Sequence, residues 1–162
     1  MRNCIVIFLL LLSFSGFART IPVEDAGLSL SIPDDWDQGY SEEDGSYYAS
    51  SPDDQMIIIV GVMGKSELMH SERSELIHKV IMEWDLSFEV SEEEEADMNG
   101  IPVSIAYGGG VYDDVEVGGC IMLLEVEQAE YMGLVMIFGT EAGWTNYEDA
   151  VVELFVSFTV ME

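Results

Sequence analysis

The sequence predicts an α+β fold, in which an antiparallel sheet of about six or seven strands is sandwiched by two helices. Three observations predict it. Short apolar or alternating segments bounded by turn residues recur along the chain, which is typical of strands joined by short loops. Two segments show the helical spacing of apolar residues, one in the middle of the chain and one at its end. Several strand segments are continuously apolar, which indicates that the centre of the sheet is covered on both faces.

The N-terminal segment has the pattern of a secretory signal peptide. Arg2 precedes an apolar run from about Cys4 to Leu12, and Gly16 and Ala18 occupy the −3 and −1 positions of a cleavage site. The apolar run is too short to span a bilayer, although a retained membrane anchor is an alternative. We therefore expect an exported protein, periplasmic or secreted, with no stable membrane insertion after residues 1–18 are removed.

Residues 19–162 have the size of one domain, and their first half predicts three strands. Apolar and polar residues alternate from Gly27 to Ile32, which is typical of a half-buried strand. A second short strand is expected from Ser46 to Ser50, after the turn signal Asp44-Gly45. The run from Met56 to Val60 is continuously apolar, which predicts a strand covered on both faces.

The middle of the chain predicts an amphipathic helix from about Ser66 or Ser74 to Asp85. At about 100° per residue, one face of this helix is an apolar stripe. The residues of the stripe are Met69, Leu76, Ile77, Val80, Ile81 and Trp84.

Four further strands are expected after this helix. The first is Phe88–Val90, followed by an acidic turn, and the second is Ile101–Tyr107, after Asn99-Gly100. Gly108 to Gly110 with Asp113-Asp114 predict a flexible loop. The apolar runs Cys120–Val126 and Tyr131–Phe138 predict a hairpin at the centre of the sheet.

A second helix is expected at the C-terminal end. Gly143 is predicted to end the sheet, and Thr145 to Glu148 has the pattern of a capping box. Apolar residues then recur at helical spacing, namely Tyr147, Val151, Leu154 and Phe158.

Acidic residues dominate the charge of the chain. Removal of Arg2 with the signal peptide leaves 4 basic and 32 acidic residues, a formal net charge of −28. Nucleic acid and anionic membrane surfaces are therefore excluded as favourable partners. The simplest interpretation is a solvated acidic surface, while a saline habitat, weak binding of divalent cations and a basic protein partner stay open. The acids cluster beside turn residues at Asp34-Asp35, Glu42 to Asp44, Asp53-Asp54, Glu92 to Asp97 and Asp113-Asp114.

Glu-x-x-His occurs twice, as Glu67 to His70 and Glu75 to His78, and these are the only histidines of the chain. This spacing places carboxylate and imidazole on one helix face, as in carboxylate-bridged metal sites. The two copies begin ~12 Å apart along a helix, too far to share one ion, and each copy offers two ligands where a closed site needs about four. We therefore predict no metal site at these residues.

No pattern of a catalytic or cofactor site is present. The sequence lacks Gly-x-Ser-x-Gly, His-Glu-x-x-His, a phosphate-binding loop and Cys-x-x-Cys. Cys120 lies in an apolar run and is predicted to be a buried small residue. We expect a protein that is not an enzyme and binds no cofactor. Two alternatives remain, which are a divalent-cation-binding protein and a hydrolase that pairs carboxylates from the Asp53 and Asp113 loops.

Three local features and the order of elements carry a resemblance. They are the segment from Leu28 to Trp36, ending in Pro-x-x-Trp, the Ser51-Pro52-Asp53 turn before an apolar strand, and the closing helix through Ser157-Phe158. Over about residues 26–160 the chain resembles the PsbP-like superfamily, which also includes bacterial DcrB-type envelope proteins and a nuclear import factor that binds Ran. The resemblance implies an α/β/α sandwich without common catalytic residues. It also implies a role in binding other proteins or assisting their assembly, with a partner that the unusual acidity leaves unidentified.

Overall fold

The computed structural model describes residues 18–43, 45–67, 73–83, 87–112 and 114–161. Strands and helices follow one another as β1 (Ala18–Val23), β2 (Leu28–Pro33), β3 (Asp37–Ser41), β4 (Ser46–Ser50), β5 (Met56–Gly64), α2 (Arg73–Glu83), β6 (Phe88–Met98), β7 (Ile101–Tyr112), β8 (Val115–Leu124), β9 (Tyr131–Gly139), α3 (Glu141–Asn146), α4 (Glu148–Ser157) and β10 (Thr159–Val160). Two 3₁₀ turns, η1 (Glu24–Ala26) and η2 (Lys65–Glu67), precede β2 and α2. None of the helices in these ranges is long and apolar enough to cross a bilayer.

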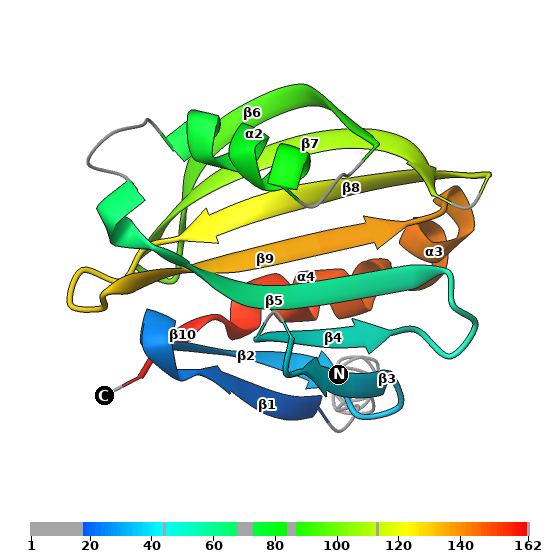
Figure 1. Ribbon diagram of the computed structural model, residues 1–162. Coiled ribbons are helices and arrows are strands. Elements are labelled where there is room, and N and C mark those ends of the chain that lie inside the picture. The colour runs from blue at the N-terminus through cyan, green and yellow to red at the C-terminus, as the bar shows by residue number, and fades with distance from the viewer. Residues whose placement is uncertain (1–17, 44, 68–72, 84–86, 113, 162) are drawn as a thin grey trace, which may run out of the picture.

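A seven-stranded antiparallel sheet forms the body of the molecule, in the order β3-β4-β5-β9-β8-β7-β6 (Figure 1). This confirms the predicted α+β class and the predicted hairpin of β8 and β9 at the sheet centre. The central position of β9 explains its burial, since the residues from Met132 to Ile137 are all buried. Long antiparallel pairing therefore fixes the frame on which the other elements pack.

A second sheet, in the order β1-β2-β10, was not predicted from the sequence. Its middle strand β2 follows the predicted alternation, because Leu28, Leu30 and Ile32 are fully buried between half-buried serines. The amide of Ser31 donates to the Ser157 hydroxyl at 2.8 Å, which ties β2 to the end of α4. The second sheet and α4 thus share the task of covering one face of the seven-stranded sheet.

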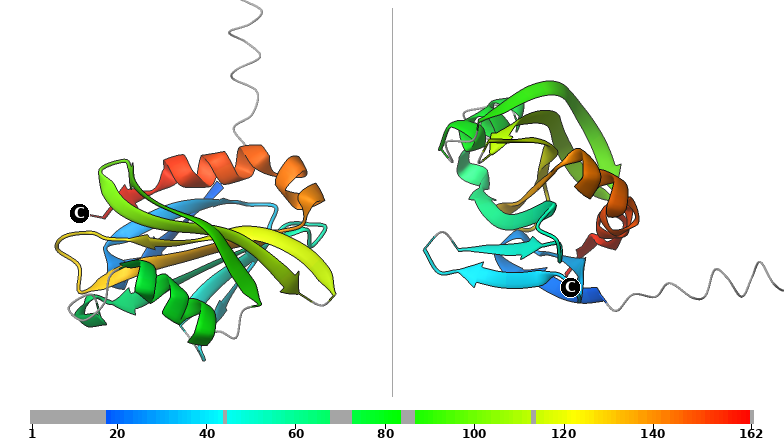
Figure 2. Two further views of the ribbon diagram at one scale, coloured as in Figure 1. Left: turned by 90° about the horizontal axis from the view of Figure 1, so that it is seen from above. Right: turned by 90° about the vertical axis from the view of Figure 1, so that its right-hand side faces the viewer.

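The core is divided in two by the seven-stranded sheet. One cluster lies between that sheet, the second sheet and α4, and includes the fully buried Leu154 and Phe158. The other lies under α2, whose Leu76, Ile77 and Val80 are buried as predicted. Figure 2 shows α2 and α4 on opposite faces of the sheet. The expectation of two helices sandwiching the sheet is therefore met.

The helix boundaries differ from those predicted. In the middle of the chain α2 begins at Arg73, after η2, while Met69, His70 and Trp84 lie outside the described residues. At the C-terminal end the prediction of a capping box from Thr145 to Glu148 was wrong, because Gly143 and Thr145 lie inside the short helix α3. Thr140 is the actual N-cap, and its side-chain oxygen accepts from the Gly143 amide at 3.1 Å.

β5 is not covered along both faces as predicted. Ile57 is 36% exposed, while Ile58 and Val60 on the other face are buried. The reason is the position of α2, which packs over β7 and β8 rather than over the start of β5. The continuous apolar run therefore predicted the strand correctly, but the prediction that both of its faces are covered was wrong.

The acidic residues from Glu92 to Glu95 lie inside β6, and the prediction of an acidic turn there was wrong. β6 pairs with β7 over its whole length, and the turn is confined to Asn99 (φ 56°) and Gly100 (φ 83°), which join Met98 to Ile101. As β6 is the terminal strand of its sheet, its charged side chains disfavour pairing with a further strand.

The glycines from Gly108 to Gly110 lie inside β7, and the prediction of a flexible loop was wrong. A Cβ at Gly108 would overlap the Glu89 carbonyl oxygen, and one at Gly110 would overlap that of Ser87. The Glu89 carbonyl lies in β6 and the Ser87 carbonyl directly precedes it, close to the point where the register shifts between Val90 and Glu92. Glycine is therefore required here for close approach of the two backbones, not for flexibility.

Candidate functional site

His78 lies against an acidic residue of β6, and no ion pair between His78 and Glu75 of its own helix is seen among the described residues. It is exposed on α2, and its Nε2 lies 3.0 Å from Oε1 of Glu93, so that the two form an ion pair when His78 is protonated. His70 lies outside the described residues, as does the side chain of Glu67. Among the described residues, no group of three or more histidine, cysteine or acidic side chains could hold a metal ion.

Asp53, one half of the carboxylate pair considered above, is a hydrogen-bond acceptor. It accepts from the Ser51 hydroxyl at 2.8 Å and the Tyr147 hydroxyl at 3.0 Å. Desolvation acts to raise the pKa of Asp53, but these hydrogen bonds outweigh it and the pKa is lowered. A lowered pKa disfavours a role as general acid. Asp113 lies outside the described residues, so the pair itself stays untested.

A cavity of about 230 Å³ lies beside the acidic strand β6, between it, β7 and α2. The carboxylates here already have partners, because the Ser104 hydroxyl donates to Glu95 at 2.6 Å and the Tyr107 hydroxyl donates to Glu94 at 2.7 Å. Desolvation and the bond to Glu94 together raise the pKa of Tyr107. These contacts attach β6 to β7. The lining residues are Ile77, Glu93, Glu94, Glu95, Ser104 and Ile105.

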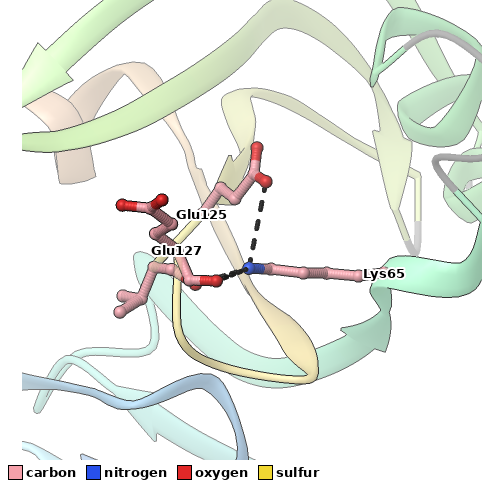
Figure 3. Close-up of polar contacts among 4 residues, drawn as sticks. Lys65, Glu125 and Glu127 are labelled. Atoms are coloured by element: carbon pink, nitrogen blue, oxygen red, sulfur yellow. Dashed lines mark hydrogen bonds and ion pairs between the residues drawn. The ribbon is translucent and has the colours of Figure 1, made fainter.

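Lys65 has a structural position at the end of β5 (Figure 3). Its Nζ donates to the carbonyl oxygens of Val126 at 2.5 Å and Glu127 at 3.3 Å, and lies 3.8 Å from Oε1 of Glu125. Its amide donates to the Glu130 carbonyl at 3.1 Å. These contacts provide hydrogen-bond donors for carbonyl oxygens of the β8–β9 turn. Lys65 therefore has a structural role in stabilising that turn.

The larger cavity, of about 420 Å³, opens between β1 and the β3–β4 hairpin and is named the tyrosine groove. Both β1 and β3 are terminal strands of their sheets, so no described strand pairs with their outer edges. Tyr40, on β3, is 53% exposed. The groove therefore presents aromatic surface and strand edges together. Its lining residues are Arg19, Thr20, Ile21, Pro22, Gln38, Gly39, Tyr40 and Tyr47.

The register of the strands fixes which side chains face the groove. Tyr40 pairs with Tyr47 across the hairpin, and their ring centroids are 4.7 Å apart at a tilt of 52°. On β1 the buried Ile21 and Val23 mark the side that faces the seven-stranded sheet, and alternation places Arg19 on this side. The tyrosine pair and Arg19 thus face the same space.

Tyr48, by contrast, lies on the opposite face of the hairpin. It pairs with Gly39, one residue out of phase with Tyr40 and Tyr47, and a Cβ at Gly39 would overlap its ring. Tyr48 is 42% exposed. The hairpin therefore carries two tyrosines of comparable exposure, of which Tyr40 lines the groove and Tyr48 does not.

Among the described residues that line the groove none is acidic, although 32 of the 162 residues of the chain are acidic. This separates it from the cavity beside β6, which is lined by three glutamates. The one local signal for it in the sequence is the Tyr47-Tyr48 pair in a predicted strand, of which Tyr47 lines the groove. β3 was missed because Asp37–Ser41 lacks both alternation and branched apolar residues.

No family model and no curated protein sequence matches the chain. Its structure, however, is similar to solved structures. Cyanobacterial PsbP (CyanoP) of Synechocystis sp. PCC 6803 aligns with a TM-score of 0.65 at 12% identity, covering 88% of this chain and 92% of that one. LpqN of Mycobacterium tuberculosis aligns with a TM-score of 0.57 at 14% identity, covering 90% and 91%. The Ran-binding protein Mog1p of Saccharomyces cerevisiae aligns with a TM-score of 0.58 at 11% identity, covering 91% and 97%. The resemblance to the PsbP-like superfamily is thereby confirmed at the level of the fold.

Proposed function

This chain has the PsbP-like fold, and we propose that it is an exported protein without catalytic activity. We propose that it binds an extended segment of a partner protein in the tyrosine groove. The tyrosine groove is the observation that carries this proposal. Extended segments bind at sheet edges through backbone hydrogen bonds, while pockets for alternate side chains provide specificity. The terminal strands β1 and β3 offer the edges, and Tyr40 and Tyr47 offer a surface for a side chain.

The exposure of Tyr40 favours a segment of a protein over a small molecule. Small-molecule sites bury most of the surface of their ligand, whereas half of the Tyr40 side chain lies open to solvent. Tyrosine is also enriched among the residues that contribute most to protein–protein affinity. One similar structure supports an envelope setting, since LpqN is involved in cell envelope biogenesis, and another supports a protein-binding role, since Mog1p is a Ran-binding protein.

The proposed absence of catalytic activity is supported by the environments of Cys120 and Asp53, the candidate nucleophile and candidate acid among the described residues. Cys120 is 1% exposed, and burial raises its pKa to about 12, which disfavours a reactive thiolate. Asp53 has a lowered pKa and accepts hydrogen bonds from its own turn and from Tyr147. Neither residue has the properties of a catalytic group.

Export is supported by the agreement between the cleavage motif and the strand that follows it. Cleavage after Ala18 would leave the β1–β2 pairs from Arg19↔Ile32 to Val23↔Leu28 intact. We expect the mature protein recovered from the exported fraction to begin at Arg19, which mass spectrometry of its N-terminal peptide measures. Exported protein that retains Met1 would contradict processing and favour the anchored alternative.

The groove itself is tested by comparing its tyrosine with the one on the opposite face. A photo-crosslinking amino acid is placed at position 40 or at position 48 in the protein as it is exported, and the crosslinked segment is identified by mass spectrometry. We expect one defined segment at position 40 and no such adduct at position 48. Calorimetric titration with the synthetic segment should then show at least ~10-fold weaker binding for Tyr40→Ala, which corresponds to an aromatic contact of 1–2 kcal/mol.

Tyr48→Ala is the matched control, because it removes an exposed tyrosine from the opposite face of the same hairpin. Its affinity for the segment should equal that of the unchanged protein. Equal crosslinking at positions 40 and 48, or equal losses of affinity for the two variants, would exclude the groove as the binding site.

A further inference from the structure

We propose that the segment bound in the tyrosine groove carries a carboxylate and that Arg19 is its counterion. This deepens the proposed function and rests on it. Of the described residues that line the groove, one is an arginine and seven are uncharged. A carboxylate is the ligand group that a guanidinium recognises best, because two N–H donors match its two oxygens in one plane.

Arg19 is placed to serve this role. It lies near the start of β1, on the side of the strand that faces the sheet, in line with the buried Ile21 and Val23. Among the described residues, no carboxylate forms an ion pair with it, whereas Lys65 is paired with Glu125. The guanidinium therefore stands beside the Tyr40–Tyr47 pair with its donors available.

The acidity of the rest of the chain makes the position of Arg19 in the groove unusual. In a chain with a net charge of −27, an arginine without a carboxylate in ion-pair contact among the described residues is not the expected outcome, and a site of the same molecule beside β6 contains three glutamates. A basic segment would find more favourable positions elsewhere on the surface. An acidic segment is repelled by most of the surface, whereas in the groove the guanidinium of Arg19 is the charged group of the described lining and charges beyond about 8 Å are largely screened at physiological ionic strength.

The carboxylate has two sources, which are the C-terminus of a chain and an aspartate or glutamate side chain. Both offer the same chemistry to Arg19. A randomised octapeptide library, prepared once with free C-termini and once with amidated C-termini, separates them. The purified protein is immobilised, the bound peptides are sequenced, and enrichment is compared with that on Tyr40→Ala protein.

We expect at least ~10-fold enrichment of peptides with a carboxylate at one fixed position, since hydrogen bonds between charged groups are stronger than those between neutral groups. Enrichment confined to the free C-termini would assign the terminal carboxylate. Persistence in the amidated library, with aspartate or glutamate at a constant position, would assign a side chain. Arg19→Gln should abolish the carboxylate preference in either case. Lys79→Gln, which removes a positive charge from α2 on the far face, should leave it unchanged.

Two results would overturn the inference in distinguishable ways. Enrichment that depends on Tyr40 but shows no preference for a carboxylate, or a preference that survives Arg19→Gln, would refute the role of Arg19 and leave the groove as a binding site. Enrichment that is the same on Tyr40→Ala protein as on the unchanged protein would refute the groove and the proposed function with it.

Discussion

Replacing Gly110 with alanine should lower the free energy of unfolding by about 3 kcal/mol, at the upper end of the range for overpacking. Gly110 lies in β7, opposite Phe88 of β6, where a Cβ would overlap the backbone carbonyl oxygen of Ser87. A backbone atom cannot rotate away as a side chain can. Relief therefore requires the start of β6 to move away from β7, which would disturb the hydrogen bonds of that pair and the burial of Phe88.

Gly118→Ala is the matched control for this substitution. Gly118 lies in the adjacent strand β8, and the atom nearest to its added Cβ would be Nε1 of Trp144 at 3.7 Å, an ordinary contact distance. Reduced freedom of the unfolded chain should make Gly118→Ala neutral or more stable by up to about 1 kcal/mol. Urea unfolding of the two variants measures the difference. Equal stabilities would show that β6 and β7 tolerate a wider separation than their geometry implies.

The frame of the fold could be predicted from the sequence because its signals are local. The apolar runs around Cys120 and Val135 are long enough to require a central position in a sheet, and Asn99-Gly100 favours a two-residue turn whatever surrounds it. The helix stripe through Leu76 and Val80 likewise depends only on spacing. These predictions were confirmed.

The predictions that were wrong concern residues whose conformation is set by distant partners. Glu92 to Glu95 resemble a solvated turn, yet pairing with β7 holds them in a strand. The glycines at 108–110 resemble a loop, yet the close approach of β6 explains them. In both cases tertiary pairing overrides local propensity. For β6 the sequence offers little to detect, because an edge strand with mostly exposed side chains has no clear pattern of burial.

The tyrosine groove could not be predicted for a related reason. Its residues come from β1 and from the β3–β4 hairpin, which belong to different sheets and lie side by side only once both sheets pack on one core. Arg19 lies next to the expected cleavage site and Tyr40 lies in an unpredicted strand. No spacing in the sequence relates them. The Tyr47-Tyr48 pair places aromatic residues in this hairpin, but it does not distinguish the one that lines the groove from the one on the opposite face.

The thiol of Cys120 should react about 1,000-fold more slowly in the folded protein than in the unfolded protein at pH 8. Burial raises its pKa from 9.0 to about 12, and at a fixed pH below the pKa each unit by which the pKa rises lowers the thiolate fraction about ten-fold. Reaction with a disulfide reagent, followed by absorbance in a Cys4→Ser background, measures the rate for the only remaining thiol. A folded-state rate within ten-fold of the unfolded rate would mean that the β8 core opens far more readily than its burial implies.

The same shift makes the fold sensitive to alkali. Because the folded pKa of Cys120 lies above the unfolded value, its contribution to stability is fully present below pH 9 and is lost as the pH rises toward 12. The loss should be about 1.4 kcal/mol per pH unit and about 4 kcal/mol in total. Cys120→Ala should remove this part of the slope in urea unfolding between pH 9.5 and 11. A further decline above pH 10 should persist in the variant, because desolvation and the bond to Glu94 raise the pKa of Tyr107 as well. An unchanged slope in Cys120→Ala would show that the thiol does not titrate with unfolding and that the tyrosines alone set the alkaline limit.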